Sequence, residues 1–129
     1  MGQGAGLPVH QVPGDVLAAL SGTVTPQGIV AVCPFLDVPL ATALSATPPP
    51  KLVAVLVQVR DPGNAGTVLR AADAAGAGAV ILPDESVDPY NGTCVRAPAG
   101  SLFPLPIVSG LPPAHAVRAP RPPGPPPPP

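Results

Sequence analysis

Apolar and polar positions in the middle of the chain fall into blocks that predict a strand, a helix and a second strand. Residues 51–59 (KLVAVLVQV) form a β-branched apolar run with the length of a buried strand. After a short polar loop, the Ala-rich stretch from Ala65 to Ala77 favours a helix. Asn64 is placed to cap the first turn of this helix. Residues 79–82 (AVIL) predict the second strand and complete a βαβ unit.

The βαβ unit implies parallel strands and a right-handed crossover. In such sheets ligands gather at the carboxyl ends of the strands, where residues 60–64 lie. The stretch from Leu102 to Val108 predicts a third strand, and Pro104 and Pro106 indicate that it lies at a sheet edge. We therefore expect the α/β class, with an incomplete parallel Rossmann-like sheet.

The segment before this unit predicts smaller elements. Residues 16–20 (VLAAL) predict a short helix, and residues 29–33 (IVAVC) predict a strand. A lone helix and strand cannot close a core, so they must pack on something else. Residues 36–44 and the proline-rich 47–50 predict a linker, with a domain boundary near residue 48.

The charge, the cysteine content and the apolar runs of the chain exclude several classes of function. The net charge is −1, from six basic and seven acidic residues, which is not the basic surface of an autonomous RNA-binding protein. Cys33 and Cys94 are isolated and match no metal-ligand spacing, so no metal site is predicted. The N-terminus has no signal-peptide pattern, and no apolar run approaches the roughly 20 residues that span a bilayer. We expect a cytoplasmic protein with no membrane partner.

Both ends of the chain predict disorder. Residues 1–14 are rich in glycine, and residues 111–129 are mostly Pro, Ala, Arg and Gly without periodicity. The tail ends in five consecutive prolines, which favour polyproline II. It is either a ligand for an SH3- or WW-type domain or the product of a frameshift in G/C-rich DNA. We prefer the frameshift interpretation.

Residues 60–77 (RDPGNAGTVLRAADAAGA) resemble the first signature motif of the SpoU (TrmH) family of RNA ribose 2′-O-methyltransferases. The resemblance continues through SVDPYN at 86–91, VRA at 95–97 and GSLFPLPI at 100–107. Residues 20–32 also resemble the end of the small substrate-binding domain of this family.

The resemblance implies an organisation and an activity. Residues 15–47 would be the C-terminal remnant of the RNA substrate-binding domain with its linker, and 48–110 the N-terminal part of a SPOUT-type α/β-knot methyltransferase domain. The implied reaction transfers a methyl group from S-adenosylmethionine to a ribose 2′-hydroxyl of ribosomal or transfer RNA. The family acts as a homodimer, and no DNA partner is implied.

The resemblance gives Arg70 a role in activating the ribose hydroxyl. Because an arginine stays protonated in proteins, we assign Arg70 instead to clamping an RNA phosphate beside the reacting ribose. The alternative is an ion pair with Asp61 or Asp73 that holds the loop. By resemblance Asn64 shapes the RNA side of the site.

Arg60 and Arg96 are weaker candidates for phosphate contacts, and solvation at the surface is the alternative for both. Gly63 and Gly66 are predicted to let the backbone come close to a ligand.

The resemblance ends before the part of the family that binds the methyl donor, so the residues that bind S-adenosylmethionine are unknown. We expect the chain as given to be a truncated, inactive form. Two alternatives are a non-catalytic RNA-binding remnant and an interaction protein that acts through its Pro-rich tail.

Overall fold

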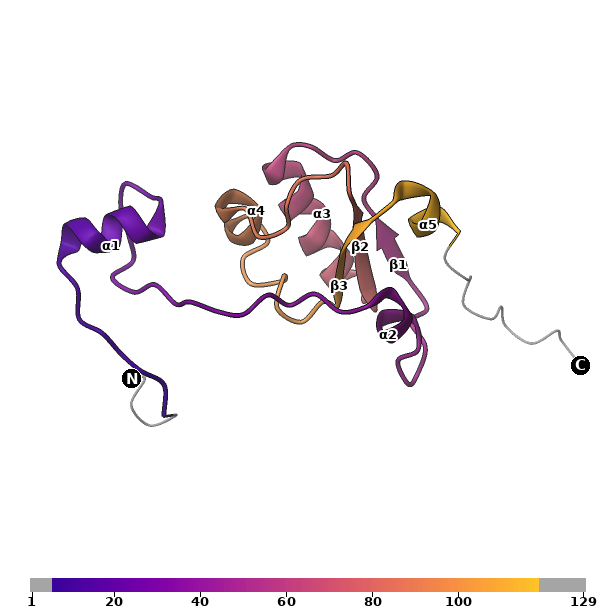
Figure 1. Ribbon diagram of the computed structural model, residues 1–129, viewed down its shortest axis with the longest axis horizontal. Coiled ribbons are helices and arrows are strands. Elements are labelled where there is room, and N and C mark those ends of the chain that lie inside the picture. The colour runs from indigo at the N-terminus through magenta and orange to yellow at the C-terminus, as the bar shows by residue number, and fades with distance from the viewer. Residues whose placement is uncertain (1–5, 119–129) are drawn as a thin grey trace, which may run out of the picture. The chain divides into compact units, whose positions relative to one another are not determined.

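The computed structural model describes residues 6–118, and the chain divides between Pro34 and Phe35 into two compact units. The first unit contains helix α1 (Gly14–Ser21), which covers the predicted 16–20 helix and ends at Gly22 in the left-handed conformation (Figure 1). The strand predicted at 29–33 is wrong, because these residues form neither helix nor strand and Val32 is fully exposed. A β-branched run becomes a strand only where a neighbouring strand can pair with it.

A three-stranded parallel sheet is the centre of the second unit. Its strands are β1 (Val53–Val55), β2 (Ala79–Pro83) and β3 (Ile107–Leu111), in the order β1-β2-β3. Both strand pairs are parallel, which confirms the predicted βαβ unit. Helix α3 (Pro62–Ala74) connects β1 to β2, and α4 (Gly92–Arg96) lies between β2 and β3 along the chain (Figure 1).

Two predicted strands are shorter than expected. β1 ends at Val55 because the chain turns at Gln58, whose φ of 55° lies in the left-handed region. β3 begins after Pro106 and not at Leu102, because the residues before it form turns and the prolines there have no N–H to donate. β3 lies at the edge of the three-stranded sheet, as predicted.

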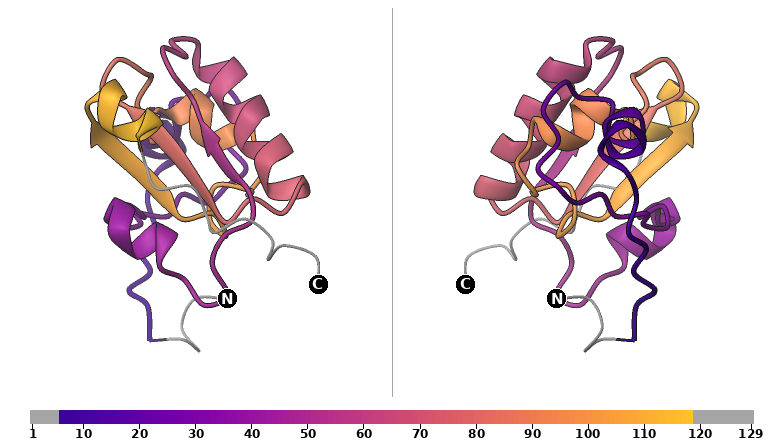
Figure 2. Two further views of the ribbon diagram at one scale, coloured as in Figure 1. Left: turned by 90° about the vertical axis from the view of Figure 1, so that its right-hand side faces the viewer. Right: turned by 90° about the vertical axis from the view of Figure 1, so that its left-hand side faces the viewer.

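Helices cover both faces of the sheet. Alternate residues of β2 point to opposite sides: Val80 and Leu82 pack with α3 and α4, and Ala79 and Ile81 pack on the other face. Figure 2 shows α3 on one side of the sheet, with α2 (Leu40–Leu44) and α5 (Pro113–Val117) on the other. All five residues of β2 are buried, so this strand is the centre of the core.

The segment predicted as a linker packs on this sheet. Asp37 pairs in parallel with Ile107, and the Val38 amide donates to the Ile107 carbonyl at 2.9 Å. Ala43 of α2 is buried against β2 and β3. Residues 36–44 therefore belong by their contacts to the second unit, because the open edge of β3 offers unpaired backbone groups.

The tail predicted to be disordered from residue 111 is folded as far as α5. Leu111 completes β3, and Ala116 is buried against Ile81 and Val108. Pro113 occupies the first helical position, where a missing N–H costs nothing, so a proline-rich sequence still forms a helical turn. The predicted polyproline stretch lies outside the described residues. Between residues 6 and 118, no helix is long and apolar enough to cross a membrane.

Gly66 of α3 packs tightly against the C-terminal end of α4. A Cβ at this position would lie 2.4 Å from the Ala97 Cβ and 3.1 Å from the Pro98 Cδ. Gly66 is fully covered by these neighbours, so the prediction that it admits a ligand is wrong. The residue lets two helices approach one another.

We expect Gly66→Ala to lower the free energy of unfolding by about 1–3 kcal/mol, because the added methyl group overpacks this contact. Chemical denaturation followed by circular dichroism measures the change. Gly14→Ala is the matched control, since a Cβ at Gly14 meets nothing within 4 Å. Equal stability of the two variants would contradict the packing role.

Candidate functional site

The loops that follow β1 and β2 are joined at the carboxyl edge of the sheet, where α/β proteins bind their ligands. The first loop leads into α3, and the second leads towards α4. Three hydrogen bonds connect them: Gln58 Nε2 to Glu85 Oε2 at 2.8 Å, Ser86 Oγ to the Leu56 carbonyl at 2.6 Å, and the Val87 amide to the Val59 carbonyl at 2.8 Å. The two loops therefore form one connected surface.

Helix α3 begins one turn earlier than predicted. Asp61 is the N-cap, and its Oδ1 accepts a hydrogen bond from the Asn64 amide at 2.7 Å. Pro62 follows at the first helical position, where its fixed φ favours the helix. The prediction that Asn64 caps the helix is therefore wrong. Its side chain lies in the first turn and is exposed.

Arg70 lies further along α3 and is also exposed. Arg70 lies six positions after Asn64 on the helix. This spacing corresponds to a distance of about 9 Å along the helix axis and an angle of about 120° around it. Within residues 6–118, Arg70 makes no ion pair with Asp61 or Asp73. The guanidinium group therefore faces solvent.

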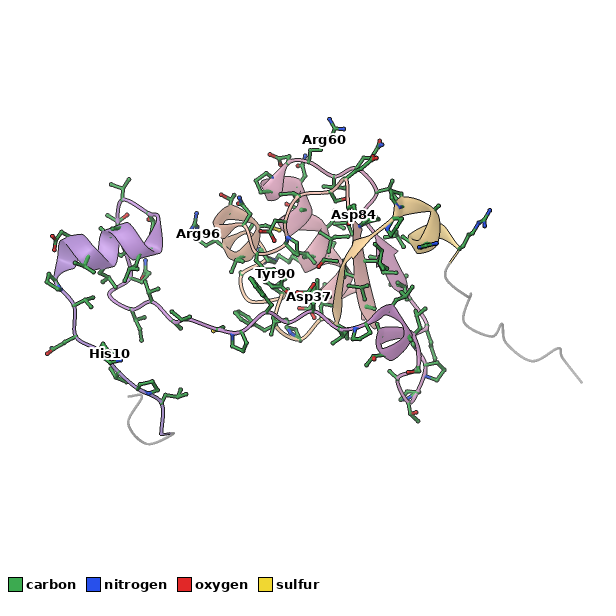
Figure 3. The ribbon with its side chains drawn as sticks, viewed as in Figure 1. His10, Asp37, Arg60, Asp84, Tyr90 and Arg96 are labelled. Atoms are coloured by element: carbon green, nitrogen blue, oxygen red, sulfur yellow. The ribbon has the colours of Figure 1, made fainter. Side chains whose placement is uncertain are left out.

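The other two predicted arginines are exposed at separate places. Arg60 extends outward from the loop before α3, and Arg96 ends α4 (Figure 3). The Arg96 guanidinium folds back over the start of its own helix, with Nη1 3.2 Å from the position of a Cβ on Gly92. The four predicted site residues are all exposed but lie apart from one another on the surface: Arg60, Asn64, Arg70 and Arg96. Their roles stay predictions.

A small cavity of about 210 Å³ opens at the carboxyl ends of β2 and β3. Its polar side chains are Asp84, Ser86, Asp88 and Ser109. Pockets for drug-sized ligands usually enclose about 300–1,000 Å³, so this cavity is small. Among the described residues no three His, Cys, Asp or Glu side chains are grouped as a metal site needs.

Tyr90 is a polar centre that the sequence analysis missed. Its hydroxyl donates to Asp37 Oδ2 at 2.6 Å and accepts from the Leu36 amide at 2.9 Å. The Tyr90 ring packs on Phe35 with centroids 4.7 Å apart, and Asp37 also accepts a hydrogen bond from Ser109 Oγ. Asp37 and Tyr90 lie side by side in Figure 3. Asp37 is 53 residues away along the chain, so no local sequence signal indicates the pair.

Burial changes the acidity of two groups in this region. Burial first, then the hydrogen bond to Asp37, raises the pKa of Tyr90 to about 12. Burial, followed by the negative charge of Asp88, raises the pKa of the Cys94 thiol. A buried thiol with a raised pKa is a poor nucleophile, so Cys94 is a packing residue.

Parallel strands and crossover helices on one face define an α/β protein, and its candidate site is the carboxyl edge of the sheet. Residues 51–119 match the model of the SpoU rRNA Methylase family. The chain belongs to this family. Residues 2–39 match a second model, described as RNA 2′-O ribose methyltransferase substrate binding.

Curated relatives include two bacterial enzymes. The 23S rRNA (guanosine(2553)-2′-O)-methyltransferase RlmP of Bacillus subtilis is 41% identical over 103 residues, which are 80% of this chain and 39% of RlmP. The 23S rRNA (guanosine-2′-O-)-methyltransferase RlmB of Bordetella pertussis is 36% identical over 107 residues, covering 81% of this chain and 44% of RlmB. The chain thus spans about two-fifths of the length of these relatives.

Solved structures agree with the family and the fold. The AdoMet-bound rRNA methyltransferase from Sinorhizobium meliloti aligns with a TM-score of 0.60 and 32% identity, over 83% of this chain and 41% of that one. A second structure of an rRNA methyltransferase from the same organism aligns with a TM-score of 0.57 and 31% identity, over 77% of this chain and 38% of the other. AdoMet is S-adenosylmethionine, the cofactor of the family.

We expect Asp61→Ala to lower the free energy of unfolding by about 1 kcal/mol, because it removes the N-cap of α3. Asn64→Ala should change it by less than half of this, since alanine favours the helix and the Asn64 side chain caps nothing. Thermal unfolding of both variants measures the difference. A larger loss in Asn64→Ala would contradict the assignment of the cap.

We expect Tyr90 to titrate near pH 12, above its usual value near 10. The folded state therefore favours the protonated phenol, and this stabilisation is complete below pH 10 and lost as the pH rises to about 12. Tyr90 is the only tyrosine and the chain has no tryptophan, so the ultraviolet absorbance of tyrosinate reports this group alone.

The titration of Tyr90 in the Asp37→Ala variant is compared with that in the wild-type chain. Loss of the hydrogen bond and of the negative charge should move the Tyr90 pKa down towards its usual value. An unchanged titration in the variant would show that Asp37 does not raise the pKa.

Proposed function

We propose that this chain supplies the RNA-facing part of a ribose 2′-O-methyltransferase that acts on ribosomal RNA. The observation that carries the proposal is the family match over residues 51–119, which includes the β1–α3–β2 unit with Arg70 exposed on α3. The relatives named above act on 23S ribosomal RNA by their names. The chain spans about two-fifths of the length of these relatives.

Arg70 is proposed to clamp a phosphate beside the reacting ribose. A guanidinium group offers two parallel N–H donors that match two phosphate oxygens. Arg70 is exposed and has no carboxylate partner within the described part of the chain. RNA would therefore bind without first breaking an internal ion pair.

Asn64 is proposed to contact the RNA with its side-chain amide. Since Asp61 caps α3, the Asn64 side chain is not needed by the helix end. Asn64 can donate and accept hydrogen bonds in the first turn of α3. Arg60 and Arg96 are proposed to add phosphate contacts at the periphery.

The cavity at the carboxyl ends of β2 and β3 does not fit the methyl donor. S-adenosylmethionine is the cofactor of the family, but the cavity at the ends of β2 and β3 has only about 210 Å³, below the size usual for such ligands. When bound, the donor supplies the methyl group. We assign none of the residues of this chain to its binding, and the proposed roles are limited to RNA.

The first unit is proposed to bind RNA as well, because residues 2–39 match the substrate-binding model. By its resemblance to the family we also propose a homodimer that acts in the cytoplasm. In such an assembly a second copy would add its own RNA contacts.

A second candidate function is RNA binding without catalysis. The small cavity favours it, because the exposed arginines need no donor pocket to bind phosphate. The two functions differ in one measurable step, the transfer of a labelled methyl group to RNA.

We expect Arg70→Ala to weaken the binding of 23S ribosomal RNA about fivefold to tenfold at moderate salt, because one phosphate contact is lost. The slope of log affinity against log salt should fall by about 1. Fluorescence anisotropy with fragments transcribed in vitro measures both quantities.

Lys51→Ala is the matched control. It removes the same charge from an exposed residue just before β1, at the opposite end of that strand from Arg60. Equal weakening in both variants would contradict a specific role for Arg70. Methyl transfer from labelled S-adenosylmethionine by the chain alone would contradict RNA binding without catalysis.

A further inference from the structure

The segment Phe35 to Val38 is held along the outer edge of β3. The Val38 amide donates to the Ile107 carbonyl at 2.9 Å, and the Leu36 amide donates to the Tyr90 hydroxyl at 2.9 Å. These two backbone contacts fix the direction of the segment. Asp37 lies between them.

The side chain of Asp37 completes the attachment. One carboxylate oxygen accepts from the Tyr90 hydroxyl at 2.6 Å and the other from Ser109 Oγ. Hydrogen bonds from hydroxyls to a charged acceptor are short and strong. The Tyr90 ring also contacts the ring of Phe35, with centroids 4.7 Å apart. Tyr90 therefore contacts three consecutive residues of the segment.

Residues 35–39 lie where the substrate-binding match and the second unit overlap along the chain. The substrate-binding match extends to residue 39, yet the contacts of residues from Phe35 onward belong to the second unit. The last residues of the RNA-binding match are thus held by the methylase unit. Residues 29–34 before them are exposed and form neither helix nor strand.

We propose that Tyr90, Asp37 and Ser109 form a latch that sets the length of the connection between the two units, and that Tyr90 is a positioning residue for RNA held by the first unit. This inference rests on the proposed RNA-binding function. Opening the latch would release residues 35–37, which adds about 10 Å of extended chain to the connection, while Val38 stays bonded to Ile107. A longer connection lowers the effective concentration of one RNA-binding unit at the other.

The first test measures the latch itself. Tyr90→Phe keeps the ring over Phe35 but removes the hydroxyl that serves Leu36 and Asp37. A spin label on the exposed Cys33, attached briefly so that the buried Cys94 is spared, should become more mobile in the variant. An unchanged spectrum overturns the latch.

Two further variants serve as controls for that test. Asp37→Asn keeps one acceptor oxygen for the Tyr90 hydroxyl, and its NH2 group can donate to Ser109 Oγ, so it should retain most of the wild-type spectrum. Asp37→Ala should match Tyr90→Phe. Ser45→Ala removes a hydroxyl bonded to the Thr42 carbonyl on α2, away from the latch, and should leave the spectrum unchanged. If Ser45→Ala mobilises the label equally, general loosening explains the result and the latch is overturned.

The second test measures RNA affinity by anisotropy with 23S ribosomal RNA fragments. Tyr90→Phe should weaken binding about threefold to tenfold through the longer connection, and Asp37→Asn should bind nearly as the wild type does. A mobile label with unchanged affinity overturns the positioning role of Tyr90. If the wild-type chain does not bind RNA, the proposed function and the positioning role fail, while the spin label still decides whether the latch exists.

Discussion

The complete burial of β2 is the constraint on which the rest of the second unit depends. All five residues of this strand are buried, and the first four, Ala79 to Leu82, alternate between the two core clusters on opposite faces of the sheet. A strand covered on both faces must be apolar along its whole length, and the sequence AVILP meets this condition. Both helix layers pack against this one strand, so disturbance of either layer affects the other through it.

The position of β2 also determines where the polar surface lies. Its parallel neighbours end at the same edge, and the loops from β1 and β2 are tied together there by hydrogen bonds from Gln58, Ser86 and Val87. Gln58 adopts a left-handed conformation that is uncommon for a residue with a side chain. Its bond to Glu85 helps to hold that conformation. Hydrogen bonds to the β2 loop, together with the buried strand β2, therefore hold in place the loop that carries Arg60 and leads into α3.

The sequence predicts those features that depend on neighbours along the chain. The βαβ unit follows from the apolar run at 51–59 and the Ala-rich helix, but the true cap, Asp61, was missed because Asn64 is an equally good capping residue on sequence grounds. The latch between Asp37 and Tyr90 joins residues 53 positions apart, and no pattern in either segment indicates the other. The role of Gly66 also depends on a helix that is distant in sequence. Of the candidate site, sequence could give the identities of the exposed arginines but not their separation on the surface.

A net charge of −1 is compatible with an RNA-binding surface, because several acidic side chains are bonded to internal donors and Arg60 and Arg70 near α3 make no ion pair within the described part of the chain. Asp61 accepts from the Asn64 amide, Asp88 from the Tyr90 amide, Glu85 from Gln58, and Asp37 from Tyr90 and Ser109. Internal donors thus fix the positions of these carboxylates. Within residues 6–118, neither Arg60 nor Arg70 makes an ion pair. A phosphate that approaches α3 therefore meets guanidinium groups with no internal ion pair, while Asp61 and Asp73 of the same segment oppose its binding. Exposed charges more than about 8 Å away are largely screened by physiological salt.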